Sequence, residues 1–190
     1  LDGYESTTMT TFEQLAGLPP YGDPAIGFPL EWASRGSEGV VVKFDVPGAG
    51  AWVGNFAPGI LGLSWVSRHP NGEDVLVSAQ GALYSVNPRT RKAIEVCSVA
   101  FSAIELPDGI VFERQGLAFF KIGRAGVEWS TRRISWDGVR NVRVDGERLL
   151  GEACSPHDDG WISFEVCLRS GKATGGSYDG PDRLEWEKLA

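Results

Sequence analysis

The stretch DVLVSAQGALYSVNP, residues 74–88, decides the fold class of this chain. Two short apolar runs flank a Gln-Gly pair. This is the pattern of two β-strands joined by a tight turn, because glycine readily adopts the positive φ that such a turn needs. The stretch GIVFERQGLAFFKIG, residues 109–123, repeats the pattern about 35 residues later. The repetition predicts a scaffold of short strands and by itself points to no chemistry.

Three units of similar length follow one another around these two stretches. They cover residues 62–96, 101–134 and 139–176, and each reads as short apolar runs separated by turns rich in Gly, Pro, Asp or Asn. The shared order is a turn such as PNGED or PDG, an apolar strand, a second turn, a strand such as LYSVN or FEVCL, and then PRTRK or RSGK. A less regular fourth unit is predicted over residues 27–60.

Four-stranded units of about 35 to 40 residues resemble the blades of a β-propeller. The resemblance is architectural and covers about residues 62–176. No Trp-Asp dipeptide ends a third strand, because SWDG at 135–138 lies between the second and third units. The resemblance implies at most four blades, and a β-sandwich or an open barrel built from similar meanders is the alternative. The predicted fold class is all-β in each case, with at most a short N-terminal helix.

The predicted division of the chain is an irregular N-terminal segment, residues 1–26, followed by a single all-β domain, residues 27–190. A length of 190 residues suits one domain with a real core. Within the first segment, TTFEQLAGL could form a helical turn that Thr10 or Thr11 caps and Gly17 ends. No long amphipathic helix follows residue 25, so an α/β fold is not expected.

The net charge of −7 argues against general nucleic-acid binding, because an acidic chain repels a phosphate backbone. Residues 46–67 carry no charge, but two prolines and five glycines favour loops around buried strands over a membrane span. The first twenty residues lack the pattern of a signal peptide, so a cytoplasmic location is expected. One segment is locally basic and is interpreted as a solvated sheet face, with an anion or an acidic partner as the alternative. Its arginines are Arg124, Arg132, Arg133, Arg140, Arg143 and Arg148.

The three cysteines are interpreted as free, buried thiols of a reducing compartment. Cys97 and Cys167 lie in apolar runs. A bond between Cys154 and Cys167 is not expected, because a turn near residue 158 would place Cys154 opposite about residue 163.

The candidate ligand-binding residues lie in turns. Trp136 and Asp137 belong to a connecting loop, where the tryptophan ring is expected to be exposed. His157 and Asp158 belong to the turn PHDDG, and His69 lies in the turn-like segment SRHPNGED, so both histidines are expected at the surface. Adjacent residues on a tight turn rarely converge on one ion, so no metal site is predicted, and no motif indicates a cofactor.

The only candidates for catalysis are carboxylates. Glu128 and Glu152 stand among apolar or small neighbours, where burial would raise the pKa of a carboxyl group and suit a general acid. The alternative is that both face solvent from alternating strands. The seven tryptophans could line a sugar platform, although packing between sheets is the default interpretation.

These observations favour a non-enzymatic binding module that recognises a protein or a small ligand. Within that class, an acidic inhibitor or immunity-type partner that covers a basic site is one possibility. The first alternative is a carbohydrate-active enzyme that uses paired carboxylates and tryptophan platforms. The second is a structural or oligomerising β domain that pairs through edge strands at residues 27–33 or 184–189.

Overall fold

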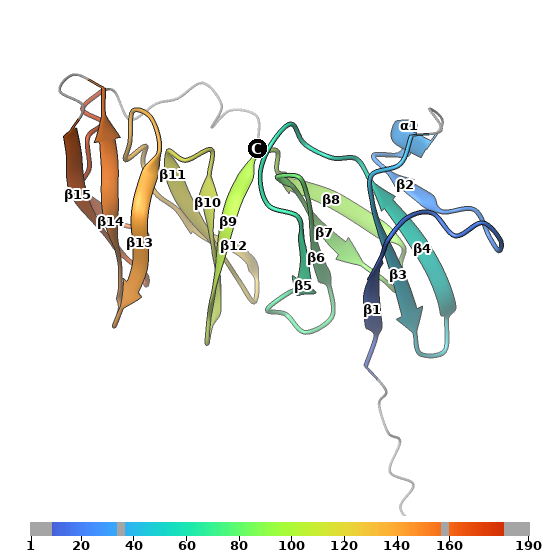
Figure 1. Cartoon of the computed structure of the whole chain (residues 1–190). Helices are drawn as coiled ribbons and strands as arrows, with labels where there is room; N and C mark the ends of the chain where they lie inside the picture. Colours follow the sequence, from blue (N-terminus) through green and yellow to red (C-terminus); the bar gives the residue numbers. More distant parts are fainter. Residues whose placement is uncertain (1–8, 34–36, 157–159, 181–190) are drawn as a thin grey trace, which may run out of the picture. The chain divides into compact units, whose positions relative to one another are not determined.

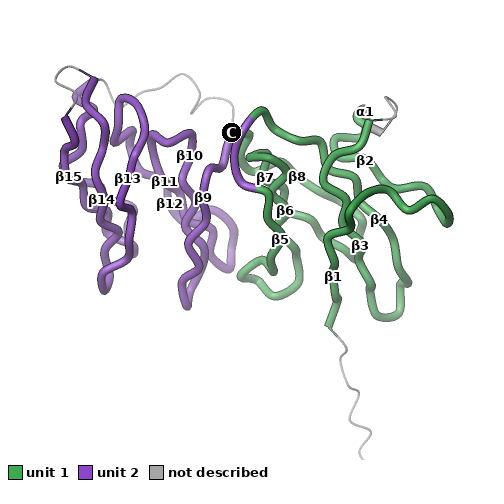
Figure 2. Tube along the Cα trace, in the orientation of Figure 1, with its two compact units in different colours: residues 1–60, 64–98 green, residues 61–63, 99–190 purple. Residues whose placement is uncertain are grey.

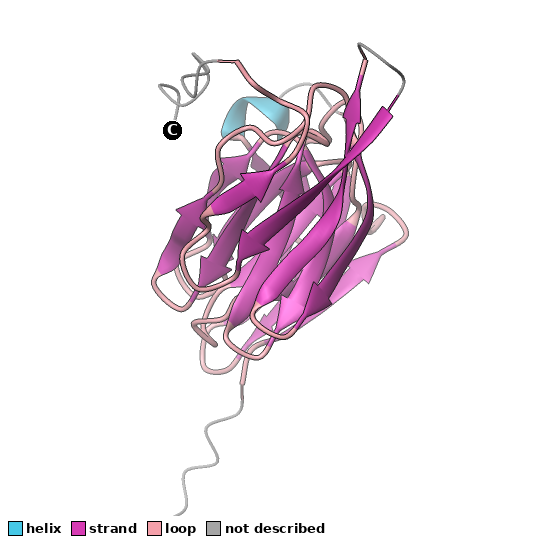
Figure 3. Ribbon diagram, turned by 90° about the vertical axis from the view of Figure 1, so that its left-hand side faces the viewer, coloured by secondary structure: helices cyan, strands magenta, loops and turns pink. Residues whose placement is uncertain are grey.

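The computed structural model describes residues 9–33, 37–156 and 160–180. Within these ranges the regular structure consists of β-strands joined by turns and loops, with one short helix, α1 (Leu30–Ala33) (Figures 1 and 3). The strands are β1 (Thr11–Leu15), β2 (Ile26–Phe28), β3 (Val40–Val46), β4 (Gly50–Phe56), β5 (Trp65–Arg68), β6 (Val75–Ala79), β7 (Ala82–Asn87), β8 (Lys92–Cys97), β9 (Ala100–Leu106), β10 (Gly109–Arg114), β11 (Ala118–Gly123), β12 (Gly126–Ser130), β13 (Val139–Asp145), β14 (Arg148–Ser155), β15 (Gly160–Cys167) and β16 (Ala173–Gly175).

The three predicted repeat units are each one four-stranded antiparallel sheet. Residues 62–96 contain β5 to β8, residues 101–134 fall on β9 to β12, and residues 139–176 contain β13 to β16, with neighbours in the chain paired in each sheet. The two Gln-Gly pairs make the predicted hairpin turns, because Gln80 and Gln115 both have positive φ, 46° and 56°, and a glycine follows each of them. The propeller-like repeats and the all-β class are confirmed.

The fourth sheet has the strand order β1-β3-β4-β2, in which β2 runs parallel to β4. The predicted helical turn at residues 10–18 is wrong, because residues 11–15 form β1 and pair with β3 from Thr11–Asp45 to Leu15–Val41. This edge strand therefore belongs to a unit predicted to begin at residue 27. Only the start of the edge strand predicted at residues 27–33 is correct, because β2 ends at Phe28 and residues 30–33 form α1. The other predicted edge strand, residues 184–189, lies outside the described ranges.

The chain divides into two compact units, drawn in separate colours in Figure 2. Unit 1 comprises residues 1–60 and 64–98 and holds the sheets β1–β4 and β5–β8. Unit 2 comprises residues 61–63 and 99–190 and holds the sheets β9–β12 and β13–β16. Each unit is thus a pair of sheets, and the single domain over residues 27–190 stays a prediction.

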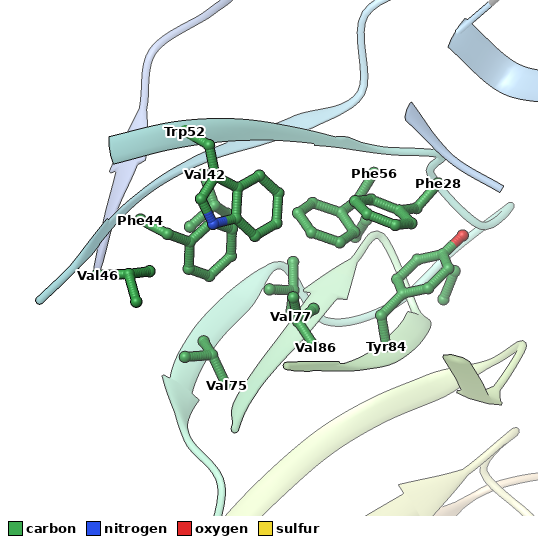
Figure 4. Close-up of a cluster of buried hydrophobic side chains, with 12 residues drawn as sticks. Phe28, Val42, Phe44, Val46, Trp52, Phe56, Val75, Val77, Tyr84 and Val86 are labelled. Atoms are coloured by element: carbon green, nitrogen blue, oxygen red, sulfur yellow. The ribbon is translucent and has the colours of Figure 1, made fainter. Parts of the chain in front are cut away.

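The core of unit 1 is rich in aromatic rings. Phe44 stacks on Trp52 with ring centroids 4.4 Å apart, and Phe28 stacks on Phe56 at 5.1 Å. Phe56 also meets Tyr84 of the second sheet at 5.4 Å. Figure 4 shows these rings of the first sheet above a floor of valines from the second, with Val75, Val77 and Val86 labelled.

Among the described residues, the core of unit 2 has fewer ring contacts than that of unit 1, and most of its members are aliphatic. Phe119 meets Phe164 across the two sheets at 5.6 Å, and Leu149, Val166 and Ile134 are fully buried beside them. Burial of this kind is the main stabilising contribution in each pair of sheets.

A tryptophan ties the two sheets together in each unit. The Trp52 indole N–H donates a hydrogen bond to the carbonyl of Pro88, at 2.9 Å, and the Trp129 indole donates to the carbonyl of Leu168, at 2.8 Å. Both acceptors stand directly after the third strand of the second sheet, β7 in unit 1 and β15 in unit 2. Both tryptophans are therefore core residues, as the default interpretation expected.

The fold decides the predictions made for His69 and for the cysteines. The prediction of an exposed His69 is wrong: its side chain is buried, and Nδ1 accepts a hydrogen bond from the backbone N–H of Asn71. Cys154 lies opposite Trp161 and Cys167 opposite Arg148, so their strand positions keep the two thiols apart, and all three cysteines are free. Cys97 is buried as predicted, whereas the prediction of burial is wrong for Cys154 and Cys167, which are half-buried. No helix in the described ranges is long and apolar enough to cross a membrane.

Candidate functional site

A buried lysine lies in unit 2, in the middle of the apolar run AFFKI. The side chain of Lys121 on β11 is only 3% exposed. Its Nζ is 2.6 Å from a carboxylate oxygen of Asp108 and 3.0 Å from one of Glu128. Isolated charges are very costly to bury, so this ammonium is tolerable only because two carboxylates compensate it.

The strand pairing explains how the three groups meet. Lys121 stands between Val111 of β10 and Trp129 of β12, in a row whose side chains belong to the core of unit 2. The turn between β9 and β10 supplies Asp108, and β12 supplies Glu128. Both carboxylates therefore come from the same sheet as Lys121 and reach its ammonium group.

Two glycines make room for this ion cluster. A methyl group at Gly109 would lie 2.8 Å from Cε of Lys121 and 2.6 Å from the carbonyl oxygen of Ile122. A methyl group at Gly123 would collide with the carboxyl group of Glu128. A side chain at either position would displace part of the cluster.

The environment keeps Lys121 and Asp108 charged at neutral pH. Burial lowers the pKa of the Lys121 ammonium, but the hydrogen bonds and negative charges of Asp108 and Glu128 outweigh burial, so the pKa lies above its ordinary value. The hydrogen bond from Lys121 in turn holds the pKa of Asp108 below its ordinary value. The cluster is thus an ionic site rather than a proton-transfer pair.

The ion cluster lines a cavity of about 410 Å³, which we call the Lys121 cleft. A volume in the range of a few hundred Å³ and a mixture of apolar walls with a few convergent polar groups are typical of ligand sites. A second ion pair, Glu147 to Arg169 at 3.1 Å, stands at the cleft on exposed side chains. The apolar walls are Leu106, Pro107, Val144 and Leu168.

The structure separates the two candidate catalytic carboxylates. Glu128 lines the Lys121 cleft, whereas Glu152 lines a different cavity, on the outer face of the β13–β16 sheet. Glu152 accepts hydrogen bonds from Asn141 at 2.7 Å and from Arg140 at 3.0 Å, and these partners hold the pKa of its carboxyl group below its ordinary value. The burial that was expected to raise this pKa is absent, so Glu152 is unsuited to act as a general acid at neutral pH.

The other candidate residues lie apart from the cleft. Trp136 is half-buried, with its ring 4.6 Å from that of Tyr178 and the Arg133 guanidinium 5.3 Å from its centroid, so it is not the freely exposed ring that was expected. Asp137 is exposed beside it. His157 and Asp158 lie outside the described residues, and within the described ranges no group of His, Cys, Asp and Glu side chains is placed to hold a metal ion.

Sequence reasoning missed Lys121 and Asp108. A signal was available, because a lysine inside an apolar run of a predicted inner strand must be either compensated or functional. The contribution of the neighbouring sheet could not be inferred in the same way. Val144, Gly146 and Glu147 reach the cleft from the end of β13 and from the turn that follows it, and strand patterns do not specify such contacts.

Comparison with known proteins finds likenesses of fold only. No family model and no curated protein matches the chain. BamB from Moraxella catarrhalis is 15% identical over 88% of this chain and 50% of its own, with a TM-score of 0.41. The N-terminal domain of Nup159 is 18% identical over 81% and 42%, with a TM-score of 0.40, and the computationally designed Ika8 protein is 9% identical over 75% and 47%, with a TM-score of 0.38. The chain thus spans half the length of these solved chains or less, and likenesses this weak say nothing about function.

Proposed function

We propose that this chain is a non-enzymatic binding module that recognises a protein partner by taking a lysine or arginine side chain of that partner into the Lys121 cleft. The observation that carries the proposal is the composition of the cleft: apolar walls and an excess of carboxylates around a cavity of about 410 Å³.

The walls suit the long apolar stem of a basic side chain. Lysine and arginine bury their methylene groups along apolar surfaces while the charged end stays near polar groups. Leu106, Pro107 and Leu168 offer such a surface. A short or polar side chain would leave it uncovered.

The charges at the cleft suit a cation. Three carboxylates stand there against two cationic side chains, so one negative charge is left over. Asp108 and Glu147 are largely exposed, with 73% and 76% of their side chains accessible, and a partner can reach them without breaking the buried contacts of Lys121. The net charge of −7 adds long-range attraction for a basic partner.

The test is fluorescence anisotropy with a labelled, capped peptide of alternating alanine and lysine, compared with the same peptide carrying norleucine in place of lysine. We expect Glu147→Gln to weaken binding of the lysine peptide by roughly 5- to 10-fold, as the loss of a polar contact of about 1 kcal/mol implies. Glu165→Gln, outside the cleft, is the matched control and should leave binding unchanged. Equal binding of the lysine and norleucine peptides, or equal loss in both variants, would refute the proposal.

A further inference from the structure

The outer face of the β13–β16 sheet carries a second cavity, of about 640 Å³, which we call the outer hollow. We propose that it is a binding site for a neutral carbohydrate, independent of the Lys121 cleft. Three features of the hollow support this site: its shape, the hydrogen bonds that hold its polar groups, and the charges of its side chains.

The shape follows from the register of the four strands β13 to β16. Successive side chains of a strand alternate between the two faces of its sheet. On β14, Leu149 and Ala153 point into the core of unit 2, so Leu150 and Glu152 point outward. The small side chain of Ser163 lies opposite Glu152 on β15 and forms a low centre, with longer side chains around it. The side chains that rise around it include Asn141, Arg143, Leu150, Glu152, Glu165 and Thr174.

The carboxylates of the hollow are held in place before any ligand arrives. Glu152 uses Oε2 to accept from both Arg140 and Asn141, and Glu165 uses Oε2 to accept from Arg148, at 3.2 Å. Among the described residues neither Oε1 atom has a partner, so each carboxylate keeps one oxygen for a ligand. Preorganised polar groups of this kind reduce the entropy lost on binding.

A neighbouring ring fixes one of these arginines. The guanidinium of Arg140 lies 4.0 Å from the centre of the Trp161 ring, which is the geometry of a cation–π contact. Arg140 therefore pairs with Glu152 on one side and with an aromatic face on the other. The rigid arrangement favours a ligand that makes several directed hydrogen bonds.

The remaining groups supply donors as well as acceptors. The guanidinium of Arg143 and the hydroxyl groups of Ser163 and Thr174 line the same hollow as the two carboxylates. A sugar hydroxyl both donates and accepts, so it can satisfy mixed groups of this kind. An apolar ligand would instead leave these groups unpaired in a partly desolvated site, which is unfavourable.

The charges argue for a neutral ligand. Arg140 pairs with Glu152, and Arg148 pairs with Glu165. Within each pair the positive and negative charges largely cancel. An anionic ligand would meet both carboxylates, and a cationic ligand would meet the guanidinium of Arg143. Leu150 is the one long aliphatic side chain of the rim, and it gives the apolar face of a sugar ring a place to rest.

The experiment is saturation-transfer NMR on the whole chain with six neutral disaccharides: maltose, cellobiose, lactose, mannobiose, xylobiose and chitobiose. Isothermal titration follows for any disaccharide that shows transfer. We expect at least one to bind. Ser163→Leu, which fills the low centre of the hollow from an outward-facing position, should weaken binding at least 10-fold. Arg143→Met should weaken it about 5-fold.

Ser130→Leu is the matched control, because it makes the same substitution at an exposed strand position outside the hollow, and it should leave sugar binding unchanged. Circular dichroism of each variant checks that the chain is folded. Absence of transfer with all six sugars, or equal binding by the Ser163→Leu variant, would overturn the proposal. Conversion of a sugar during the measurement would show that the hollow is a catalytic site, and this result would also overturn the proposal.

Discussion

Unit 1 and unit 2 are built alike but differ in what they bury. Unit 1 fills the space between its sheets with five aromatic rings in contact, and its polar interior is made of neutral or locally satisfied groups around His69. Among the described residues, unit 2 has fewer ring contacts, and it buries the cation of Lys121 between the core residues Val111 and Trp129. Unit 2 therefore buries a charged side chain in addition to its apolar core, and packing alone does not require that charge.

The polar network of unit 1 has a structural explanation. Asp74 accepts from the side-chain amides of Asn71, at 2.9 Å, and Asn87, at 2.8 Å, and Asn71 accepts from the backbone of Glu73 and Asp74. These bonds fix the turn between β5 and β6. Burial, opposed by Asp74, lowers the pKa of His69, so this imidazole is neutral at neutral pH. Nothing in the network adjoins a described cavity, in contrast to the cluster of Lys121.

The largest expected effect is in the ring stack of unit 1. We expect Phe56→Ala to lower the free energy of unfolding by about 3 to 5 kcal/mol, because it removes a fully buried ring that contacts Phe28, Phe44 and Tyr84. Urea unfolding followed by circular dichroism measures the change. Phe119→Ala in unit 2 should cost less, since that ring has one aromatic neighbour among the contacts described, and a larger loss there would reverse the comparison.

The buried charge of unit 2 predicts an asymmetry between its partners. Replacing both Asp108 by Asn and Glu128 by Gln leaves Lys121 buried without compensation, and we expect a loss of about 3 kcal/mol at neutral pH. Lys121→Met should cost less than about 1 kcal/mol, because the two carboxylates it releases are 73% and 39% exposed and return to water. Equal losses in the two variants would contradict this account.

Lys121 and Asp108 make the free energy of unfolding depend on pH in opposite directions. In the native chain the pKa of Lys121 is raised, so its contribution to stability is present below the ordinary lysine pKa and is lost as the pH rises through the higher folded value. The depressed pKa of Asp108 adds stability above its ordinary value, which is lost as the pH falls through the folded value. In the double variant burial alone lowers the pKa of Lys121, so stability should increase as the pH rises toward the ordinary value. Unfolding at a series of pH values tests both signs.

A middle-sized effect is expected in the turn of unit 1. Asp74→Ala leaves the amides of Asn71 and Asn87 without their acceptor, and we expect a loss of about 2 kcal/mol. Glu73→Ala, in the same turn but exposed, is the control and should change stability by less than about 0.5 kcal/mol. Thermal unfolding of both variants under the same conditions decides the matter, and a loss as large in the control would mean that the network does not hold the turn.

The smallest effect concerns a single hydroxyl in unit 1. Burial, with the charge of Glu95, raises the pKa of Tyr84 to about 12, and its hydroxyl donates to the carbonyl of Ala57 at 3.0 Å. The ultraviolet titration of phenolate should show one tyrosine that ionises near that value, and this step should vanish in Tyr84→Phe. The substitution should cost about 1 kcal/mol. Because the folded pKa is raised, the stability of the native chain should fall as the pH rises above the ordinary tyrosine value, and the variant should lose less.

The sequence patterns predicted the repeats well because each repeat is local. β5 to β16 are meanders whose turns carry Gly, Asp or Asn, so strand, turn and pairing partner lie close together in the chain. β1 was missed because Phe12 and Leu15 stand at a helical spacing after possible caps at Thr10 and Thr11. Pairing with β3, about 30 residues away, overrides that local preference.

The candidate sites were less accessible to sequence reasoning. Glu128 and Glu152 were singled out as candidate catalytic carboxylates, and the structure places them at two different cavities. The diagonal partner of Glu152 on the outer face is Glu165, which strand alternation alone could have indicated. The cleft required contacts between turns of two sheets, and alternation within a strand does not contain that information.

The two indole hydrogen bonds have a consequence for how the chain folds. Each of them joins residues far apart in sequence, 36 positions for Trp52 and Pro88 and 39 for Trp129 and Leu168, whereas the hairpins around them close over a few residues. Contacts of long sequence separation form late, because loop closure must precede them. Each tryptophan therefore enters its final environment when two preformed sheets dock, and the time course of its fluorescence follows the docking of sheets rather than the formation of hairpins.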